Sequence, residues 1–309
     1  LAIKGVAWAA SARGRHIVTS AVEHHAVLHT CQVLERSGFE VTYVPVDRYG
    51  RVDPDAVAAA ITDRTSLVSV MYANNEVGSV EPIAEIAALC RGRGVRFHTD
   101  AVQAAGHLPL DVDALGVDLM SLSAHKIYGP KGVGALYVRR GQALLPQVQG
   151  GSQERQRRAG TENIAGAVGF ARALQLVAEA EANVAELRDA LVRGMTALSG
   201  VILTGDPVER LPNNASFLVE AVNGGDLVAA LDLEGIEVST GSACTSGSTE
   251  PSHVLLAMGF EPREAAGSLR MTVGAGTTAD EVRRTVEVAA SVIERLRGMV
   301  ASRVGVASA

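Results

Sequence analysis

The chain alternates between short apolar runs and segments whose apolar residues recur every three or four positions. In the first half, the short runs predict strands at residues 16–20, 41–46, 66–72, 95–99, 119–122 and 134–138. Helical periodicity predicts helices at residues 26–35, just after Asp53-Pro54, and at residues 83–91. This alternation indicates a mostly parallel sheet with helices on both faces.

The second half has a different pattern. Residues 164–198 form one long helical pattern that we expect to link two domains. The segments beyond it predict strands at 201–204, 215–219, 237–239 and 268–273, and helices at 226–233 and 279–297. We therefore expect a large domain over residues 1–165, a connecting helix over 166–198, and a smaller C-terminal α/β domain over 199–309.

Composition narrows the class of protein. Of 309 residues, 47% are apolar, which is enough for a sizeable core in two or three domains. The net charge of −6 does not suggest a nucleic-acid surface, and no uncharged apolar run is long enough to span a membrane. Three scattered cysteines fit neither a disulfide framework nor a zinc site. We expect a cytoplasmic globular protein without a metal site.

Three polar clusters lie at the ends of predicted strands. They are Asn74-Asn75-Glu76, His98-Thr99-Asp100-Ala101-Val102-Gln103 and Ser121-Leu122-Ser123-Ala124-His125-Lys126. Ligands of parallel sheets bind at the carboxyl ends of the strands, so the three clusters predict one site.

Lys126 and Asp100 suggest the chemistry of that site. Because Lys126 directly follows an apolar strand, we expect its amine to be partly desolvated. Desolvation lowers the pKa of a lysine and favours Schiff-base formation. Asp100 could hold a positive charge in the same pocket. A lysine together with an aspartate that pairs with a pyridinium nitrogen is what a protein contributes to pyridoxal phosphate chemistry.

Six motifs in order make the prediction more specific. They are Glu23-His24-His25-Ala26, Asn74-Asn75-Glu76-Val77-Gly78, His98-Thr99-Asp100-Ala101-Val102-Gln103, Ser123-Ala124-His125-Lys126, Arg158-Ala159-Gly160-Thr161-Glu162-Asn163 and Gly241-Ser242-Ala243-Cys244-Thr245-Ser246. In order and spacing the chain resembles the cysteine desulfurases of the NifS/IscS-like group, within the class V pyridoxal-phosphate aminotransferase family. The resemblance covers nearly the whole chain.

The resemblance implies a fold and an activity. The fold is that of the fold type I, aspartate aminotransferase-like transferases, and the enzyme is a homodimer that binds pyridoxal 5'-phosphate. It removes sulfur from L-cysteine, releases L-alanine and leaves a persulfide on an enzyme cysteine. The sulfur then passes to an acceptor or iron–sulfur scaffold protein, for iron–sulfur cluster assembly or tRNA thiolation.

Each motif also implies roles for single residues. Lys126 would bind the cofactor covalently and move protons. His24 would stack on the cofactor ring and assist proton transfer. The other cofactor contacts would be Asp100 to the ring nitrogen, Gln103 and Asn75 to the ring oxygen, Ser123 and His125 to the phosphate, and Thr161 to the phosphate of the partner subunit. Arg270 and Asn75 would bind the substrate carboxylate, a task that suits the planar guanidinium.

Cys244 would be the nucleophile that takes the sulfur. It lies in a Gly/Ser-rich stretch, residues 241–250, which we expect to be a mobile loop that carries a thiol between cofactor and acceptor. Cys31 and Cys90 lie inside helical patterns and are better interpreted as small core residues.

Other interpretations stay open at this point. The family carries a Gly-Ala-Thr-Glu-like phosphate turn upstream of the stretch that matches Leu1-Ala2-Ile3-Lys4-Gly5, so we expect this chain to lack an N-terminal segment. One alternative is another class V enzyme, an aminotransferase or a selenocysteine lyase, neither of which needs Cys244. The other is an inactive, truncated scaffold for a sulfur acceptor. Persulfide formation and cofactor absorbance separate these possibilities.

Overall fold

Contacts divide the protein into two compact units. The computed structural model describes residues 1–179, 183–241 and 251–307. Unit 1 comprises Leu1–Asp47, Arg51–Asn74 and Val80–Ala180, and unit 2 comprises Arg48–Gly50, Asn75–Ser79 and Glu181–Ala309. The predicted domain limits at 165 and 199 stay a prediction, and the two units are described separately.

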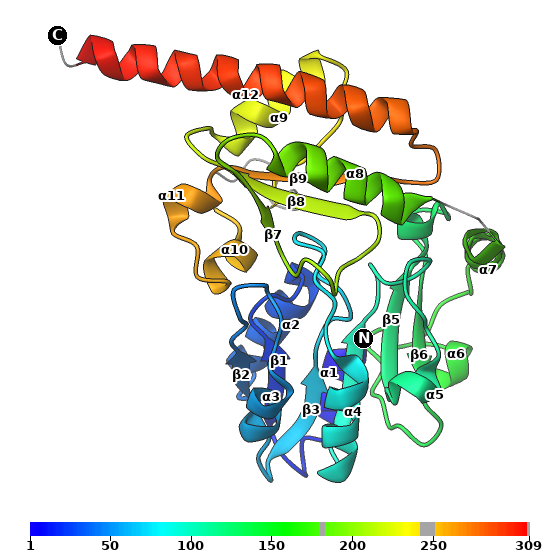
Figure 1. The fold of residues 1–309 in the computed structure, drawn as a ribbon. Coiled ribbons are helices and arrows are strands. Elements are labelled where there is room, and N and C mark those ends of the chain that lie inside the picture. Colours follow the sequence, from blue (N-terminus) through cyan, green and yellow to red (C-terminus); the bar gives the residue numbers. More distant parts are fainter. Residues whose placement is uncertain (180–182, 242–250, 308–309) are drawn as a thin grey trace. The chain divides into compact units, whose positions relative to one another are not determined.

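Unit 1 is built on a six-stranded sheet with the order β2-β1-β3-β4-β5-β6 (Figure 1). Its first five strands are parallel, and β6 pairs antiparallel with β5. The strands are β1 (His16–Ser20), β2 (Glu40–Val44), β3 (Thr65–Ser69), β4 (Arg96–Asp100), β5 (Leu119–Ser123) and β6 (Gly134–Val138). The helices are α1 (Ala2–Ala9), α2 (His25–Arg36), α3 (Pro54–Ala60), α4 (Ile83–Gly92), α5 (Val112–Leu115), α6 (Gln153–Gln156) and α7 (Ile164–Glu179), with the 3₁₀ helix η1 (Ala124–Ile127).

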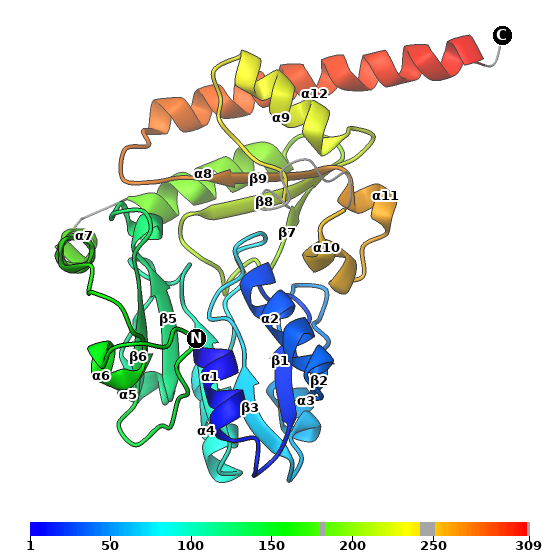
Figure 2. The same cartoon turned by 180° about the vertical axis from the view of Figure 1, so that it is seen from behind.

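Successive residues of the central strands serve opposite faces of this sheet. Val18 and Val68 pack with apolar residues of α3 and α4. Their neighbours Ile17 and Leu67 pack with α1 and α2, which can be followed in Figure 2. The period of two along each strand therefore sorts the side chains into two cores. Both faces are covered, as a parallel sheet requires.

Unit 2 contains a three-stranded antiparallel sheet of order β7-β8-β9. Its strands are β7 (Val201–Thr204), β8 (Asn214–Val219) and β9 (Ser268–Thr272), and its helices are α8 (Val184–Thr196), α9 (Gly224–Leu233), α10 (His253–Ala257), α11 (Pro262–Ala265) and α12 (Ala279–Ala307). Phe217 of β8 and Leu269 of β9 are fully buried, in one core with apolar residues of α8, α9 and α12. The central strand of this sheet, β8, is buried along its whole length.

The predicted connecting helix over 164–198 is wrong as a single element. The described residues form two helices, α7 and α8, and Asn183 is the N-cap of the second. Phe170 of α7 packs with Ala124 and Ile127 in unit 1. Leu191 of α8 packs in the core of unit 2. The spacing of apolar residues in the sequence shows that each helix has an apolar face. It does not show that the two faces pack in different cores.

The predicted strand at 237–239 is also wrong. Ser239 forms a single bridge with Arg270, with backbone N···O distances of 3.1 and 2.6 Å. The ladder ends there because the N–H of Gly241 donates to the side-chain oxygen of Ser268 instead of to a strand carbonyl. Within the described ranges, no helix is both long and apolar enough to cross a membrane.

Candidate active site

In unit 1, the carboxyl ends of β1, β4 and β5 bring His24, Asp100 and Lys126 near one another. These strands run parallel in one sheet, so the residues that follow them lie at the same edge. The charges of Asp100 and Lys126 both act on the pKa of His24, the first raising it and the second lowering it. His24, Asp100 and Lys126 therefore lie near one another at this edge.

His24 is held by the start of α2. It is the N-cap of this helix, and its Nδ1 accepts a hydrogen bond from the N–H of Ala26 at 3.1 Å. A nitrogen that accepts cannot carry the proton, so in neutral His24 the proton is on Nε2. Burial lowers the pKa of His24, and it outweighs the opposing charge of Asp100. His24 is therefore neutral at pH 7, with its proton on Nε2.

Asp100 is the buried carboxylate of this cluster. Its Oδ1 accepts a hydrogen bond from the N–H of Val102 at 3.0 Å. Burial raises the pKa of Asp100, while this bond and the charge of His24 lower it. Ionised Asp100 would thus be favoured by a cation placed next to it. Gln103 is half-buried in the turn that follows.

Lys126 lies on η1 and is exposed, so the predicted partial desolvation of its amine is wrong for this structure. Ala124 and Ile127, three positions apart, are both buried and anchor η1 in the core. The two residues between them, His125 and Lys126, then face outward. The strand that precedes Lys126 does not shield it, because the chain turns by a 3₁₀ helix in between. Ser123 and His125 are hydrogen-bonded, with Oγ and Nδ1 2.7 Å apart.

In unit 2, Arg270 and Asn75 are in direct contact. Nη1 of Arg270 donates to the carbonyl oxygen of Asn75 at 2.8 Å. Arg270 is in β9, and the bridge to Ser239 fixes its backbone. The turn after Asn75 depends on Gly78, which has a φ of +81°. A Cβ at this position would lie only 2.7 Å from Oδ1 of Asn214. The structure thus brings the two predicted carboxylate-binding residues together.

For two predicted site residues, Thr161 and Cys244, the described part of the chain gives no contact with another predicted site residue. Thr161 is exposed and precedes α7. Cys244 lies outside the described residues. The interpretation of the other two cysteines as core residues is confirmed, because Cys31 and Cys90 are both 0% exposed. Burial raises the pKa of each thiol to about 12, which keeps them in the unreactive thiol form.

The sequence analysis assigned no role to the acidic residues of two motifs. Glu23 precedes His24 and is fully buried, and its Oε1 accepts from Ser20 Oγ and from the N–H of Met71, each at 2.7 Å. Burial raises the pKa of Glu23 to about 8. Glu23 thus ties the end of β1 to the segment after β3, and so positions His24. The signal available in the sequence was only that Glu23 and Glu76 stand inside the quoted motifs.

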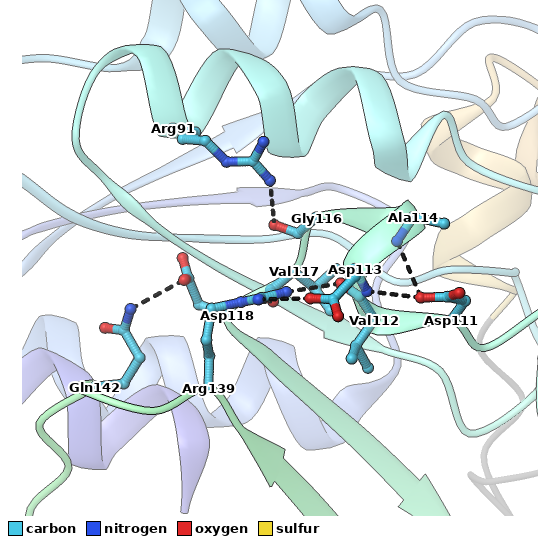
Figure 3. A network of polar contacts seen from close by, with 10 residues as sticks. All are labelled: Arg91, Asp111, Val112, Asp113, Ala114, Gly116, Val117, Asp118, Arg139 and Gln142. Atoms are coloured by element: carbon cyan, nitrogen blue, oxygen red, sulfur yellow. Dashed lines mark hydrogen bonds and ion pairs between the residues drawn. The ribbon is translucent and has the colours of Figure 1, made fainter.

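The amino-terminal edge of the same sheet has a surface cavity of about 610 Å³, lined by four arginines and two aspartates among others. Figure 3 shows that its polar groups bond to one another. Arg139 donates to Asp113 and to the carbonyl oxygens of Val112 and Val117, at 2.7 to 3.0 Å. Asp118 accepts from Gln142 at 2.9 Å. These contacts join the ends of β4, β5 and β6, so we assign the network a structural role.

Comparison with known proteins identifies the family. The sequence model described as "Aminotransferase class-V" matches residues 1–285. The chain belongs to the class V aminotransferase family. The expected fold type I architecture is confirmed, since the sheet of unit 1 is mostly parallel and the structural relatives are NifS-like proteins.

Two relatives of this chain share one printed name. The chain is 52% identical to "Cysteine desulfurase IscS" of Dictyoglomus turgidum over 302 residues, which are 96% of this chain and 77% of that protein. It is 49% identical to the protein of the same name from Methanosarcina thermophila, over 96% of this chain and 75% of that protein. The resemblance to the NifS/IscS-like group is therefore confirmed.

Solved structures of similar proteins also include NifS-like proteins. One named "NIFS-LIKE PROTEIN" has a TM-score of 0.88 and 37% identity, over 96% of this chain and 79% of that one. Another, "SspA in complex with cysteine", has a TM-score of 0.78 and 34% identity, over 90% of this chain and 78% of that one.

Proposed function

We propose that this chain is a cysteine desulfurase, which uses pyridoxal 5'-phosphate to remove sulfur from L-cysteine. The reaction yields L-alanine and a persulfide on Cys244. The observation that carries the proposal is the group of His24, Asp100 and Lys126 at one sheet edge, in a chain about half identical to relatives that bear this name. An aminotransferase or a selenocysteine lyase would need the first three residues but not Cys244.

The described residues fit the cofactor. Burial disfavours the ionised form of Asp100, and the N–H of a pyridinium ring would stabilise that form. Lys126 makes no hydrogen bond or ion pair within the described part of the chain, so its amine is available for a covalent bond. Ser123 and His125 offer a hydroxyl and an imidazole to a phosphate, with Gln103 and Asn75 proposed for the ring oxygen. When bound, the cofactor supplies an electron sink for the carbanion next to the substrate amine.

The proton steps fall to Lys126 and His24. Lys126 takes the proton from the α carbon of the substrate, which is general base catalysis. His24 presents its Nε2–H, because Nδ1 is occupied by the backbone of α2. We assign to it the donation of a proton in a later step. Glu23 keeps the end of β1, and hence the ring of His24, in place.

Substrate binding is assigned to Arg270 and Asn75. Nη1 of the guanidinium donates a hydrogen bond to the carbonyl oxygen of Asn75. The other N–H groups of Arg270 can bind a carboxylate in a bidentate manner. Because β9 and the bridge to Ser239 fix its backbone, the side chain of Arg270 starts from a rigid base. This pair would orient the substrate by its carboxylate.

Sulfur transfer is assigned to Cys244. Its thiolate attacks the substrate sulfur, a bond forms between the two sulfur atoms, and the bond between that sulfur and the substrate Cβ breaks. The electron pair of the broken bond stays with the carbon skeleton, which takes up protons to become alanine. Neither Cys31 nor Cys90 can replace Cys244, because both are buried as thiols.

The test compares two cysteine variants. We expect Cys244→Ala to keep the visible absorbance of the bound cofactor but to lose alanine release from cysteine and persulfide formation. Cys90→Ala is the matched control and should keep both. Normal alanine production by Cys244→Ala with a reductant present would contradict the assignment and favour another class V activity. Absence of cofactor absorbance in the unsubstituted chain would favour the scaffold alternative.

The assembly and its partners are further proposals. We propose a homodimer in which Thr161 reaches the phosphate of the partner subunit, and an acceptor or iron–sulfur scaffold protein that takes the persulfide sulfur in the cytoplasm. Thr161 is exposed, as a residue must be to contact a second copy. Sedimentation of the unsubstituted chain tests the dimer. A cofactor titration of Thr161→Ala, with Thr62→Ala as a control away from this loop, tests the contact.

A further inference from the structure

Glu76 is a buried acidic residue of unit 2 that the mechanism above does not use. Its side chain is 4% exposed. Its Oε2 accepts a hydrogen bond from Oγ of Ser252 at 2.5 Å. Ser252 is itself 2% exposed and is the N-cap of α10, where its Oγ accepts from the N–H of Leu255 at 3.2 Å. The carboxylate of Glu76 thus holds the residue at which α10 begins.

The same oxygen of Glu76 lies against Gly241. A Cβ added at Gly241 would stand 2.9 Å from Oε2 of Glu76 and 3.6 Å from Cβ of Ser252. A carbon at 2.9 Å from that oxygen would force the side chain of Glu76 to shift, so glycine at this position lets the chain pass close to the carboxylate. The N–H of Gly241 also donates to Oγ of Ser268 in β9, at 3.4 Å. Gly241 is therefore fixed between Glu76 and β9.

Gly241 and Ser252 stand on either side of residues 242–250, the segment that contains Cys244. One buried carboxylate therefore contacts the chain just before and just after that segment. Glu76 is also anchored on its own side, because its carbonyl oxygen accepts from Nδ2 of Asn214 at 3.3 Å. Its neighbour Asn75 is the residue that accepts from Arg270.

The donors around Glu76 offset only part of the cost of burying its carboxyl group. Burial raises the pKa of Glu76 to about 7, while the bond from Ser252 and the charge of Arg270 lower it. The charge of Arg270 thus acts on both Glu76 and the carbonyl of Asn75. Removing the carboxylate would leave the hydroxyl of Ser252 buried without this acceptor, which is unfavourable.

We propose that Glu76 is a positioning residue, whose carboxylate fixes Gly241 and Ser252. Gly241 is held at β9 and Ser252 begins α10, so Glu76 would fix both ends of the cysteine-bearing segment, residues 242–250. The proposal rests on the proposed desulfurase function. Glu76 itself touches neither substrate nor cofactor in this assignment. Its effect would be on sulfur transfer by Cys244 and not on substrate binding.

The first test measures the anchoring itself, by hydrogen exchange of the peptides that contain Gly241 and residues 251–257. Loss of one hydrogen bond to a carboxylate should speed exchange there by roughly tenfold or more in Glu76→Ala and in Ser252→Ala. Glu76→Gln keeps an acceptor for Ser252 and should restore most of the protection. Glu237→Ala removes an exposed carboxylate near the same segment and serves as the matched control.

The second test is kinetic and uses the cofactor-loaded dimer. In Glu76→Ala and Ser252→Ala we expect kcat for alanine release to fall about tenfold while KM for cysteine and cofactor absorbance stay unchanged. Glu76→Gln should recover most of kcat. A rise in KM alone would mean that Glu76 acts through Arg270 and would overturn the proposal.

The two tests can fail separately. Unchanged exchange in both Glu76→Ala and Ser252→Ala would overturn the proposed anchoring, whatever the kinetics show. If the unsubstituted enzyme released no alanine, the proposed function would fail, while the exchange experiment would still decide the anchoring. Should Glu76→Ala not fold, Ser252→Ala alone carries both measurements, because it leaves the carboxylate in place.

Discussion

The two edges of the sheet in unit 1 are both rich in polar residues but use them differently. At the amino-terminal edge, Arg139, Asp113, Asp118 and Gln142 bond to one another and to the backbone (Figure 3). At the carboxyl edge, Lys126 forms no such bond within the described residues. The nearby Asp100 is desolvated and accepts a backbone hydrogen bond.

The comparison shows how a structural network differs from a reactive site. Each of the three side-chain nitrogens of Arg139 donates to an acceptor within 3.0 Å, so the network stabilises the fold. The carboxyl edge instead keeps an amine exposed and a carboxylate buried, an arrangement that a cationic, carbonyl-bearing ligand would complete. A surface cavity alone therefore does not mark a binding site, and the exposed amine and buried carboxylate of the carboxyl edge favour the proposed one.

The largest effect should come from Lys126 at the carboxyl edge. Lys126→Ala should remove the covalent bond to the cofactor and, through general acid–base catalysis alone, lower activity by at least about a hundredfold to ten-thousandfold. Visible absorbance, followed by borohydride trapping and peptide mapping, measures the bond. The chain has only two other lysines, Lys4 and Lys131. Lys131→Ala is the matched control, and label found on Lys131 in the unsubstituted enzyme would refute the assignment.

Asp100 should come next. Asp100→Asn removes the charge that a pyridinium N–H would face, at a cost of about 1.5–3 kcal/mol for one charged hydrogen bond. Cofactor affinity should then fall roughly tenfold to a hundredfold, as measured by titration. Asp118→Asn, at the other edge of the sheet, should leave that affinity unchanged. Equal losses in the two variants would mean that the edges do not differ in the way we infer.

At the amino-terminal edge the expected effect is on stability. Arg139→Leu should lower the free energy of unfolding by about 2 kcal/mol, because two carbonyl oxygens lose a charged donor. The ion pair with the exposed Asp113 adds little, since solvent screens it. Urea unfolding measures the loss, and Arg140→Leu, an exposed neighbour, is the control. A lower cofactor affinity in folded Arg139→Leu would show that the network also serves the site.

The last prediction concerns the pH dependence of stability at the carboxyl edge. Burial raises the pKa of Glu23 from its ordinary value of 4.5 to about 8, so between these pH values folded Glu23 holds a proton that the unfolded chain has released. Stability should therefore fall as pH rises through this window, by up to about 1.4 kcal/mol per pH unit from this group, and level off above it.

Glu23→Gln should reduce that slope between pH 5.5 and 7.5, as followed by urea unfolding. The slope should not vanish, because burial also raises the pKa of Glu81 to about 8 and that of Glu76 to about 7. Exposed Glu85→Gln should keep the slope of the unsubstituted protein. An unchanged slope in Glu23→Gln would mean that Glu23 is ionised in the folded protein.

Local patterns in the sequence were sufficient for most elements of the fold. Strands β1 and β6 and strand β7 have the predicted bounds, and Asp53 caps α3 through a hydrogen bond to the N–H of Asp55, as the Asp-Pro pair suggested. The motifs likewise pointed to His24, Asp100 and Lys126 as one cluster. Such features depend on residues a few positions apart, or on the rule that parallel strands end at one edge.

Only the tertiary structure decided what depends on distant partners. The helical pattern over 164–198 divides because α7 and α8 pack into different cores. Lys126 is exposed because Ala124 and Ile127 bury the other side of its turn. The role inferred for Glu76 depends on Gly241 and Ser252, far along the chain. Burial and hydrogen-bond partners are properties of residues brought together by folding, and no local period in the sequence encodes them.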